Sequence, residues 1–235
     1  MVKPIKGLLF DKDGTLFDFH KTWGVWCAQA INAMAADDAE VADRLAGVLM
    51  FDRISGSFLK ESPVIAGTLG ELVDMVHTVF PDREKVSLHE ELRASATDID
   101  MVPAVPLMPL LTVFKSRELR IGVATNDAES AALTQLDRAG LGGQFDFIAG
   151  YDSGYGGKPA PGQLLAFAQA VDLPPEQIVM VGDSTHDLDA GRAAGMRTIG
   201  VLTGSATADE LEPHAHVVLR NIGDIPAWLE QQTKG

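Results

Sequence analysis

Near the amino terminus the chain reads Leu8-Leu9-Phe10-Asp11-Lys12-Asp13-Gly14-Thr15. The apolar run before Asp11 is typical of a buried strand, which we predict over residues 5–11. Two carboxylates two residues apart at a strand end can serve as a nucleophile and an acid–base group, and together they can hold a hard cation. An Asp-Gly turn that only closes the strand is the structural alternative.

More apolar runs of strand length follow, and helical patterns lie between most of them. Alternating strands and helices predict βα units, and therefore an α/β fold whose parallel sheet carries helices on both faces. The further predicted strands are residues 119–125, 146–150, 178–183, 197–202 and 216–219. The predicted helices are residues 128–139, 163–170 and 188–194, the last of them ending at Gly195.

Residues 19–97 break this rhythm, because they contain four helical patterns and no convincing strand. Two of the helices are predicted to start at capping boxes, Thr68-x-x-Glu71 and Ser87-x-x-Glu90. The segment Pro103–Pro109 reads as a linker back into the core. We therefore expect a core domain at 1–18 and 98–235, with a helical module at 19–97 inserted after the first strand.

Polar residues also follow three other predicted strands. Thr125 and Asn126 can bind phosphate oxygens without adding charge, and Lys158 can neutralise a phosphate. Asp183 and Asp187 suit one Mg²⁺ ligand and one residue that orients the ligand shell. Because ligands of open α/β sheets bind at the carboxyl ends of strands, the motifs predict a single site. Taken singly, they also fit a helix cap, a solvated lysine and an acidic helix terminus.

The composition argues against several classes of partner. The net charge of −14 disfavours a surface for nucleic acid or for an anionic membrane. No stretch approaches the roughly 20 apolar residues of a membrane span, and the apolar run after Lys6 is too short for a secretion signal. The single cysteine, Cys27, has no partner for an internal disulfide. We expect a cytoplasmic protein, monomeric or homodimeric.

Together the four motifs resemble those of the haloacid dehalogenase superfamily, over nearly the whole chain. That family has Asp-x-Asp-Gly-Thr, a Ser or Thr at a strand end, a Lys and, in this branch, Gly-Asp-x-x-x-Asp. Here these correspond to residues 11–15, Thr125, Lys158 and residues 182–187. Lys12 stands where the family more often has an apolar residue, and we expect it to face away from the nucleophile.

The insert at 19–97 is similar to the α-helical cap of the phosphoglycolate phosphatase-like branch. The resemblance therefore implies a Rossmann-like parallel sheet core with an inserted α-helical cap domain. It also implies a Mg²⁺-dependent phosphatase, in which Asp11 attacks phosphorus and Asp13 acts as general acid and then general base. Thr125, Asn126 and Lys158 would bind the phosphoryl oxygens. The implied Mg²⁺ ligands are the Asp11 carboxylate, the Asp13 backbone carbonyl and Asp183, with Asp187 orienting the ligand shell.

The substrate is expected to be a small phosphorylated metabolite, and the resemblance makes 2-phosphoglycolate a candidate. Arg53, in the insert, can grip a substrate carboxylate bidentately, or can belong to a solvated loop. A phosphomutase of the same superfamily would share the core motifs, and a non-catalytic phosphate-binding regulatory module would share the fold. A dehalogenase needs no acid at Asp13. A phosphonatase would need a cap lysine, for which Lys21 and Lys60 are candidates.

Overall fold

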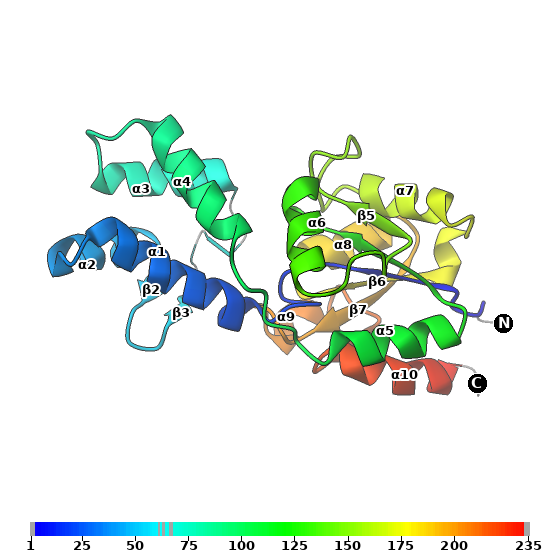
Figure 1. Cartoon of the computed structure of the whole chain (residues 1–235). Helices are drawn as coiled ribbons and strands as arrows, with labels where there is room; N and C mark the ends of the chain where they lie inside the picture. The colour runs from blue at the N-terminus through cyan, green and yellow to red at the C-terminus, as the bar shows by residue number, and fades with distance from the viewer. Residues whose placement is uncertain (1–2, 61, 63, 66–67, 233–235) are drawn as a thin grey trace. The chain divides into compact units, whose positions relative to one another are not determined.

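The computed structural model describes residues 3–232 except 61, 63, 66 and 67. The chain forms two compact units, one made of Met1–Phe19 and Met101–Gly235 and the other of His20–Asp100 (Figure 1). Among the described residues, no helix is both long enough and apolar enough to cross a bilayer.

A six-stranded parallel sheet forms the centre of the first unit, in the order β5-β4-β1-β6-β7-β8. The chain runs from β1 outward through β4 to β5 and returns to β6 on the other side of β1, so the strand order reverses beside β1. The predicted α/β class is therefore confirmed. The strands are β1 (Gly7–Phe10), β4 (Arg120–Ala124), β5 (Phe147–Ala149), β6 (Ile178–Gly182), β7 (Arg197–Val201) and β8 (Val217–Leu219).

Helices cover both faces of this sheet. Successive residues of a strand point to opposite faces, so neighbouring residues of β1 contact different helices. Leu9 joins Phe167 of α7 and Ala190 of α8 in one buried cluster. Phe10 points the other way and stacks on Phe114 of α5, with ring centroids 5.9 Å apart. The helices of this unit are α5 (Leu107–Ser116), α6 (Glu129–Arg138), α7 (Gly162–Ala170), α8 (Thr185–Ala193), α9 (Ala208–Leu211) and α10 (Ile225–Gln232), with 3₁₀ turns η2 (Pro175–Gln177) and η3 (Ile222–Asp224).

The second unit is mainly helical in its described residues, as the sequence predicts. It also holds a short antiparallel hairpin that the sequence analysis missed, in which Phe51 pairs with Phe58 and their rings lie 5.1 Å apart. Strands of two residues are too short to show an alternating pattern, so periodicity could not reveal them. The elements are the π-helical turn η1 (His20–Gly24), α1 (Val25–Ala35), α2 (Ala39–Val48), β2 (Phe51–Asp52), β3 (Ser57–Phe58), α3 (Leu69–Val79) and α4 (Lys85–Thr97).

Two of the predicted helix limits in and after the insert are wrong. The Thr68 capping box does start α3, but Ser87 lies inside α4, which begins at Lys85. A Ser-x-x-Glu pattern also fits an exposed helix interior, because residues three apart share a face. The predicted linker at 103–109 overlaps the first turn of α5, where Pro109 is tolerated because amides there have no acceptor within the helix.

Candidate active site

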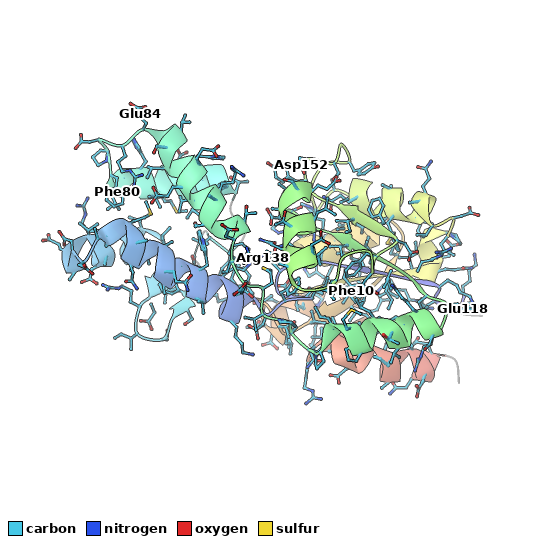
Figure 2. The ribbon with its side chains drawn as sticks, viewed as in Figure 1. Phe10, Phe80, Glu84, Glu118, Arg138 and Asp152 are labelled. Atoms are coloured by element: carbon cyan, nitrogen blue, oxygen red, sulfur yellow. The ribbon has the colours of Figure 1, made fainter. Side chains whose placement is uncertain are left out.

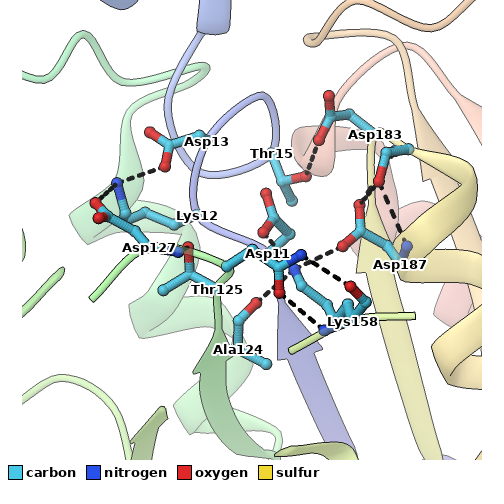
Figure 3. Close-up of polar contacts among 12 residues, drawn as sticks. Asp11, Lys12, Asp13, Thr15, Ala124, Thr125, Asp127, Lys158, Asp183 and Asp187 are labelled. Carbon is cyan, nitrogen blue, oxygen red and sulfur yellow. Dashed lines mark hydrogen bonds and ion pairs between the residues drawn. The ribbon is translucent and has the colours of Figure 1, made fainter. Parts of the chain in front are cut away.

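The register of the sheet aligns the ends of its three central strands. Phe10 of β1 pairs with Val123 of β4 and with Val181 of β6. The residues that follow these strands therefore lie at one edge of the sheet, at the point where the strand order reverses. Asp11, Thr125 and Asp183 meet there, as Figure 3 shows.

The turn after β1 depends on glycine at position 14. Gly14 has a φ of +86°, a left-handed conformation that other residues adopt at a cost. Its amide donates a hydrogen bond of 2.7 Å to the carbonyl of Phe17. A Cβ atom at this position would overlap the Asp183 carboxylate. The Asp-Gly pair therefore does form a turn, as the structural interpretation of this sequence supposed. The missing side chain of Gly14 also leaves room for the Asp183 carboxylate in the site.

Lys158 is buried and connects the motifs. Its ammonium group lies 2.5 Å from Asp11 Oδ1, 2.6 Å from Asp187 Oδ1 and 2.7 Å from the carbonyl oxygen of Ala124. An ammonium has three hydrogens, and these three acceptors can take all of them. Burial acts to lower the pKa of Lys158, but the Asp11 and Asp187 carboxylates raise it above its ordinary value. Lys158 is therefore a fixed positive charge beside Asp11, and its reading as a solvated lysine is wrong.

The polar pair after β4 is engaged with the rest of the site. Thr125 is 2% exposed, and its hydroxyl accepts a hydrogen bond of 3.1 Å from the amide of Asp127. The hydroxyl hydrogen can still be donated to a ligand. The side chain of Asn126 bonds the main chain of Lys158 in both directions, at 2.8 and 2.9 Å. The predicted phosphate contact of Asn126 stays a prediction that would use the second hydrogen of its amide nitrogen.

Asp187 is held by the start of α8. This helix begins at Thr185, three residues before the predicted start, with Ser184 as its N-cap. One oxygen of Asp187 accepts hydrogen bonds from the Ser184 amide and hydroxyl, at 3.1 and 2.6 Å, while the other faces Lys158. A Cβ atom at Gly182 would collide with the Asp187 side chain. The capping box therefore orients Asp187 toward the site.

The donor set fits a hard divalent cation. Asp11, Asp183 and Asp187 each offer a carboxylate oxygen, and these atoms lie within 4.8 Å of one another. Burial raises the pKa of Asp11 to about 7, and it raises the pKa of Asp183 well above the ordinary value. With all groups ionised, three carboxylates and the Lys158 ammonium leave a net charge of −2. An all-oxygen group with this excess charge suits a hard divalent cation better than a softer metal.

The Asp13 carboxylate is not one of this group of three. Its Oδ2 atom lies 2.5 Å from the ammonium of Lys12, which is fully buried and turns toward Gln135 of α6. The role of Asp13 as a metal ligand through its backbone carbonyl stays a prediction. The pairing of Lys12 with Asp13, Asp127 and Gln135 was missed, because nothing in the sequence marks a buried glutamine on a helix as a partner of a lysine 123 residues away.

One further predicted site residue, Arg53, lies in the second unit. Arg53 follows β2 and forms an ion pair with Asp43 of α2 on the exposed surface of that unit. Its predicted contact with substrate stays a prediction. Cys27 of the same unit is buried, and burial raises the pKa of its thiol to about 12, which keeps the thiol protonated.

Comparison with known proteins identifies the family. Residues 5–195 match the family model for haloacid dehalogenase-like hydrolases. The chain belongs to the haloacid dehalogenase-like hydrolase family. The resemblance found from the sequence motifs is therefore confirmed.

Curated relatives of this hydrolase include phosphatases matched over almost their whole length. A phosphoglycolate phosphatase of Rhodospirillum rubrum is 27% identical over 225 residues, which are 95% of this chain and 90% of the relative. A phosphoglycolate phosphatase of Escherichia coli O157:H7 is 25% identical over 236 residues, covering 95% and 92%. The prediction that the chain is an enzyme of the phosphatase type is therefore confirmed.

Solved structures share the fold of this hydrolase. CbbY from Rhodobacter sphaeroides, solved in complex with phosphate, superposes with a TM-score of 0.66 at 21% identity, over 96% of this chain and 99% of the other. A β-phosphoglucomutase from Clostridium difficile gives a TM-score of 0.61 at 20% identity, over 98% and 100%. The chain therefore shares its overall fold with both of these solved structures.

Proposed function

We propose that this hydrolase is a Mg²⁺-dependent phosphatase of small phosphate monoesters and forms an aspartyl-phosphate on Asp11. The observation that carries the proposal is the environment of Asp11. A buried carboxylate at a strand end has a lysine ammonium 2.5 Å away and two further carboxylates within reach of one cation. In its ionised form Asp11 can act as a nucleophile, and Lys158 together with a cation held by the carboxylates can offset the charge of an approaching phosphate.

The chemical steps follow from these side chains. The Asp11 carboxylate attacks phosphorus, the bond to the leaving oxygen breaks, and Asp13 gives that oxygen a proton. Asp13 then takes a proton from the water that cleaves the acyl phosphate, which restores Asp11 and releases inorganic phosphate. Such acid–base help is worth about 10²–10⁴-fold in rate.

The remaining residues bind and orient. Lys158 holds Asp11 in place and supplies positive charge next to the phosphoryl group, and the Thr125 hydroxyl donates to a phosphoryl oxygen. Asp11, Asp183 and the Asp13 backbone carbonyl would hold Mg²⁺, with Asp187 fixed by its capping box to orient the ligand shell. When bound, the cation would offset the excess negative charge and withdraw charge from the phosphoryl oxygens.

For the substrate we propose a small carboxylated phosphate ester, with 2-phosphoglycolate as the first candidate. The support is the activity named for the full-length relatives, together with an arginine in the insert that is suited to a carboxylate. A phosphomutase remains the alternative, since mutases share the fold. A regulatory module without turnover would have no need for the complete carboxylate set.

The test is a turnover assay with purified full-length chain. After treatment with EDTA and dialysis, release of inorganic phosphate is measured from p-nitrophenyl phosphate and from a panel of phosphorylated metabolites, with and without Mg²⁺. Mg²⁺-dependent release supports a phosphatase, and a preference for 2-phosphoglycolate supports the substrate. A sugar phosphate that isomerises without net phosphate release would instead indicate a mutase. Absence of turnover on every ester would overturn the proposed function.

A further inference from the structure

Lys12 is a buried ammonium group that the reaction described above leaves without a role. Its side chain is 0% exposed, directly after the nucleophile in sequence. An apolar side chain could fill the same space, whereas a buried charge is costly unless it is paired and hydrogen-bonded. The partners of Lys12 should therefore reveal what its charge does.

Among the described residues, side-chain oxygens of Asp13, Asp127 and Gln135 lie close to the Lys12 ammonium. Lys12 Nζ lies 2.5 Å from Asp13 Oδ2, 2.6 Å from Gln135 Oε1 and 3.4 Å from Asp127 Oδ2. Figure 3 shows the contacts from Lys12 to Asp13 and to Asp127 at the edge of the site. An ammonium with three hydrogens suits three such acceptors. Lys12 thus joins the proposed general acid to the region around α6.

The two partners other than Asp13 are themselves fixed. Gln135 lies on α6 and is 1% exposed. Asp127 precedes α6, and its second oxygen accepts a hydrogen bond of 2.8 Å from the amide of Ala128. The position of the Lys12 ammonium is therefore set by a helix and its leading turn. Through Lys12, the position of Asp13 Oδ2 is set by them as well.

We propose that Lys12, anchored by Asp127 and Gln135, is a positioning residue that fixes the general acid Asp13. The inference rests on the proposed function, because it assumes that Asp13 protonates the leaving oxygen. With Oδ2 held by Lys12, the proton is delivered from Oδ1, whose direction is then determined. A general acid must lie within hydrogen-bond reach of the atom it protonates. A carboxyl group held in one orientation therefore transfers its proton more often than one that rotates freely.

The test uses two substrates of nearly equal size that differ in the basicity of the leaving oxygen. Phenyl phosphate releases a more basic phenoxide than p-nitrophenyl phosphate, so its cleavage depends more on the general acid. We compare kcat/KM, which reports the steps up to departure of the leaving group, for wild type and Lys12→Met at saturating Mg²⁺. Lys12→Met should lose at least about tenfold more activity on phenyl phosphate than on p-nitrophenyl phosphate.

Two further variants make this result specific. Lys115→Met removes an exposed lysine whose ammonium donates to Gln144 at 2.8 Å, and it should change neither value. Gln135→Met removes one anchor without touching Asp13 and should give a smaller loss with the same preference. It also provides the measurement if Lys12→Met does not fold.

A double-mutant cycle decides whether Lys12 acts through Asp13. In an Asp13→Asn background, Lys12→Met should cause no further loss that depends on the leaving group. Equal losses on both substrates, or an undiminished effect of Lys12→Met in the Asp13→Asn background, would overturn the inference. A wild-type chain that cleaves neither ester would instead overturn the proposed function on which the inference rests.

Discussion

The side chain of Asn126 holds the main chain of Lys158 from both sides. Its Nδ2 atom donates to the Lys158 carbonyl at 2.9 Å, and its Oδ1 atom accepts from the Lys158 amide at 2.8 Å. The segment after β5 is thereby attached to the end of β4. Because Lys158 reaches Asp11 from this segment, Asn126 determines where the lysine charge stands.

Asn126→Ala should lower kcat by about 10²-fold, because a misplacement of about 1 Å at the reacting groups has an effect of this size. The measurement is steady-state kinetics on p-nitrophenyl phosphate at saturating Mg²⁺, with thermal unfolding as a check on folding. Asn126→Asp keeps one of the two hydrogen bonds but adds negative charge, and it should also be impaired. A folded Asn126→Ala variant with wild-type kcat would show that Lys158 is held by other contacts.

Asp11→Asn should remove turnover while leaving the fold intact. The amide can still accept a hydrogen bond from Lys158, but it cannot attack phosphorus, and we expect a loss of more than about 10³-fold. Rates are measured alongside thermal unfolding, and intact-protein mass spectrometry of quenched wild type should detect the phosphoryl adduct. Residual activity within about tenfold of wild type, with unchanged unfolding, would refute the nucleophile assignment.

The site could be predicted as far as the polar residues follow recognisable strands. Apolar runs before Asp11 and Asp183 indicate buried parallel strands, and such strands bring their carboxyl ends to one edge of a sheet. The contacts that orient these residues could not be predicted in the same way. The three acceptors of Lys158 come from residues 11, 124 and 187, and one of them is a backbone carbonyl that any residue type would provide.

The contacts of Lys12 show even more clearly that side-chain partners could not be predicted from the sequence. Local sequence identifies Lys12 as an unusual residue next to the proposed nucleophile, but its burial and its contact with Gln135 of α6 arise only in the tertiary structure. Gln135 resembles any polar residue of an amphipathic helix until the tertiary structure places it against Lys12. Predictions of element type depend on local pattern, whereas ion-pair partners depend on contacts between distant segments.

Removal of Mg²⁺ should abolish activity and lower thermal stability together, because a ligand that binds only the folded state stabilises it. Mn²⁺ or Co²⁺ should substitute, and Ca²⁺ should inhibit, since Ca²⁺ prefers six to eight looser ligands. The measurement is a Mg²⁺ titration in which both activity and unfolding temperature are recorded. Full activity after exhaustive chelation would contradict the metal site.

Asp183 and Asp187 should differ in how they affect this metal. Asp187 is engaged by Ser184 and Lys158, so we expect Asp187→Asn to weaken Mg²⁺ affinity by about 10–100-fold. Asp183→Asn removes a direct ligand and should weaken it further. Mg²⁺ dissociation constants from calorimetry decide the order, and an equal or reversed effect would assign Asp187 as a direct ligand.

The folding stability of the protein at mildly acidic pH should depend on His216, which is distant in sequence from the proposed metal ligands. The amide of Thr198 donates to His216 Nδ1 at 3.1 Å, which requires that nitrogen to be unprotonated. Burial lowers the pKa of His216, and the neighbouring Arg197 and Arg192 lower it further. The unfolded chain therefore binds this proton more readily, so this contribution is present above about pH 6.5 and is lost as pH falls through the folded pKa.

The unfolding temperature of wild type should consequently fall more between about pH 7 and about pH 5 than that of His216→Asn, whose amide oxygen can accept the same hydrogen bond. Calorimetry at matched ionic strength gives the two slopes. Parallel slopes would mean that protonation of His216 is not linked to unfolding.

Substitutions at Arg53 and Lys158 should separate substrate choice from phosphate chemistry. We expect the helical insert to act as a lid that excludes water and selects the leaving group, as lids of other enzymes do. Arg53 forms an exposed ion pair with Asp43, and exposed pairs are weak enough for a substrate carboxylate to replace Asp43. Arg53→Ala should therefore raise KM for 2-phosphoglycolate and leave KM for p-nitrophenyl phosphate nearly unaffected, whereas Lys158→Met should impair the cleavage of every ester alike.

Arg93→Ala is the matched control for Arg53→Ala, since Arg93 forms an exposed ion pair with Glu90 at 2.8 Å in the same unit. An unchanged substrate profile for Arg53→Ala would place the selectivity elsewhere in the insert, and a substrate-dependent effect of Lys158→Met would contradict its role beside Asp11.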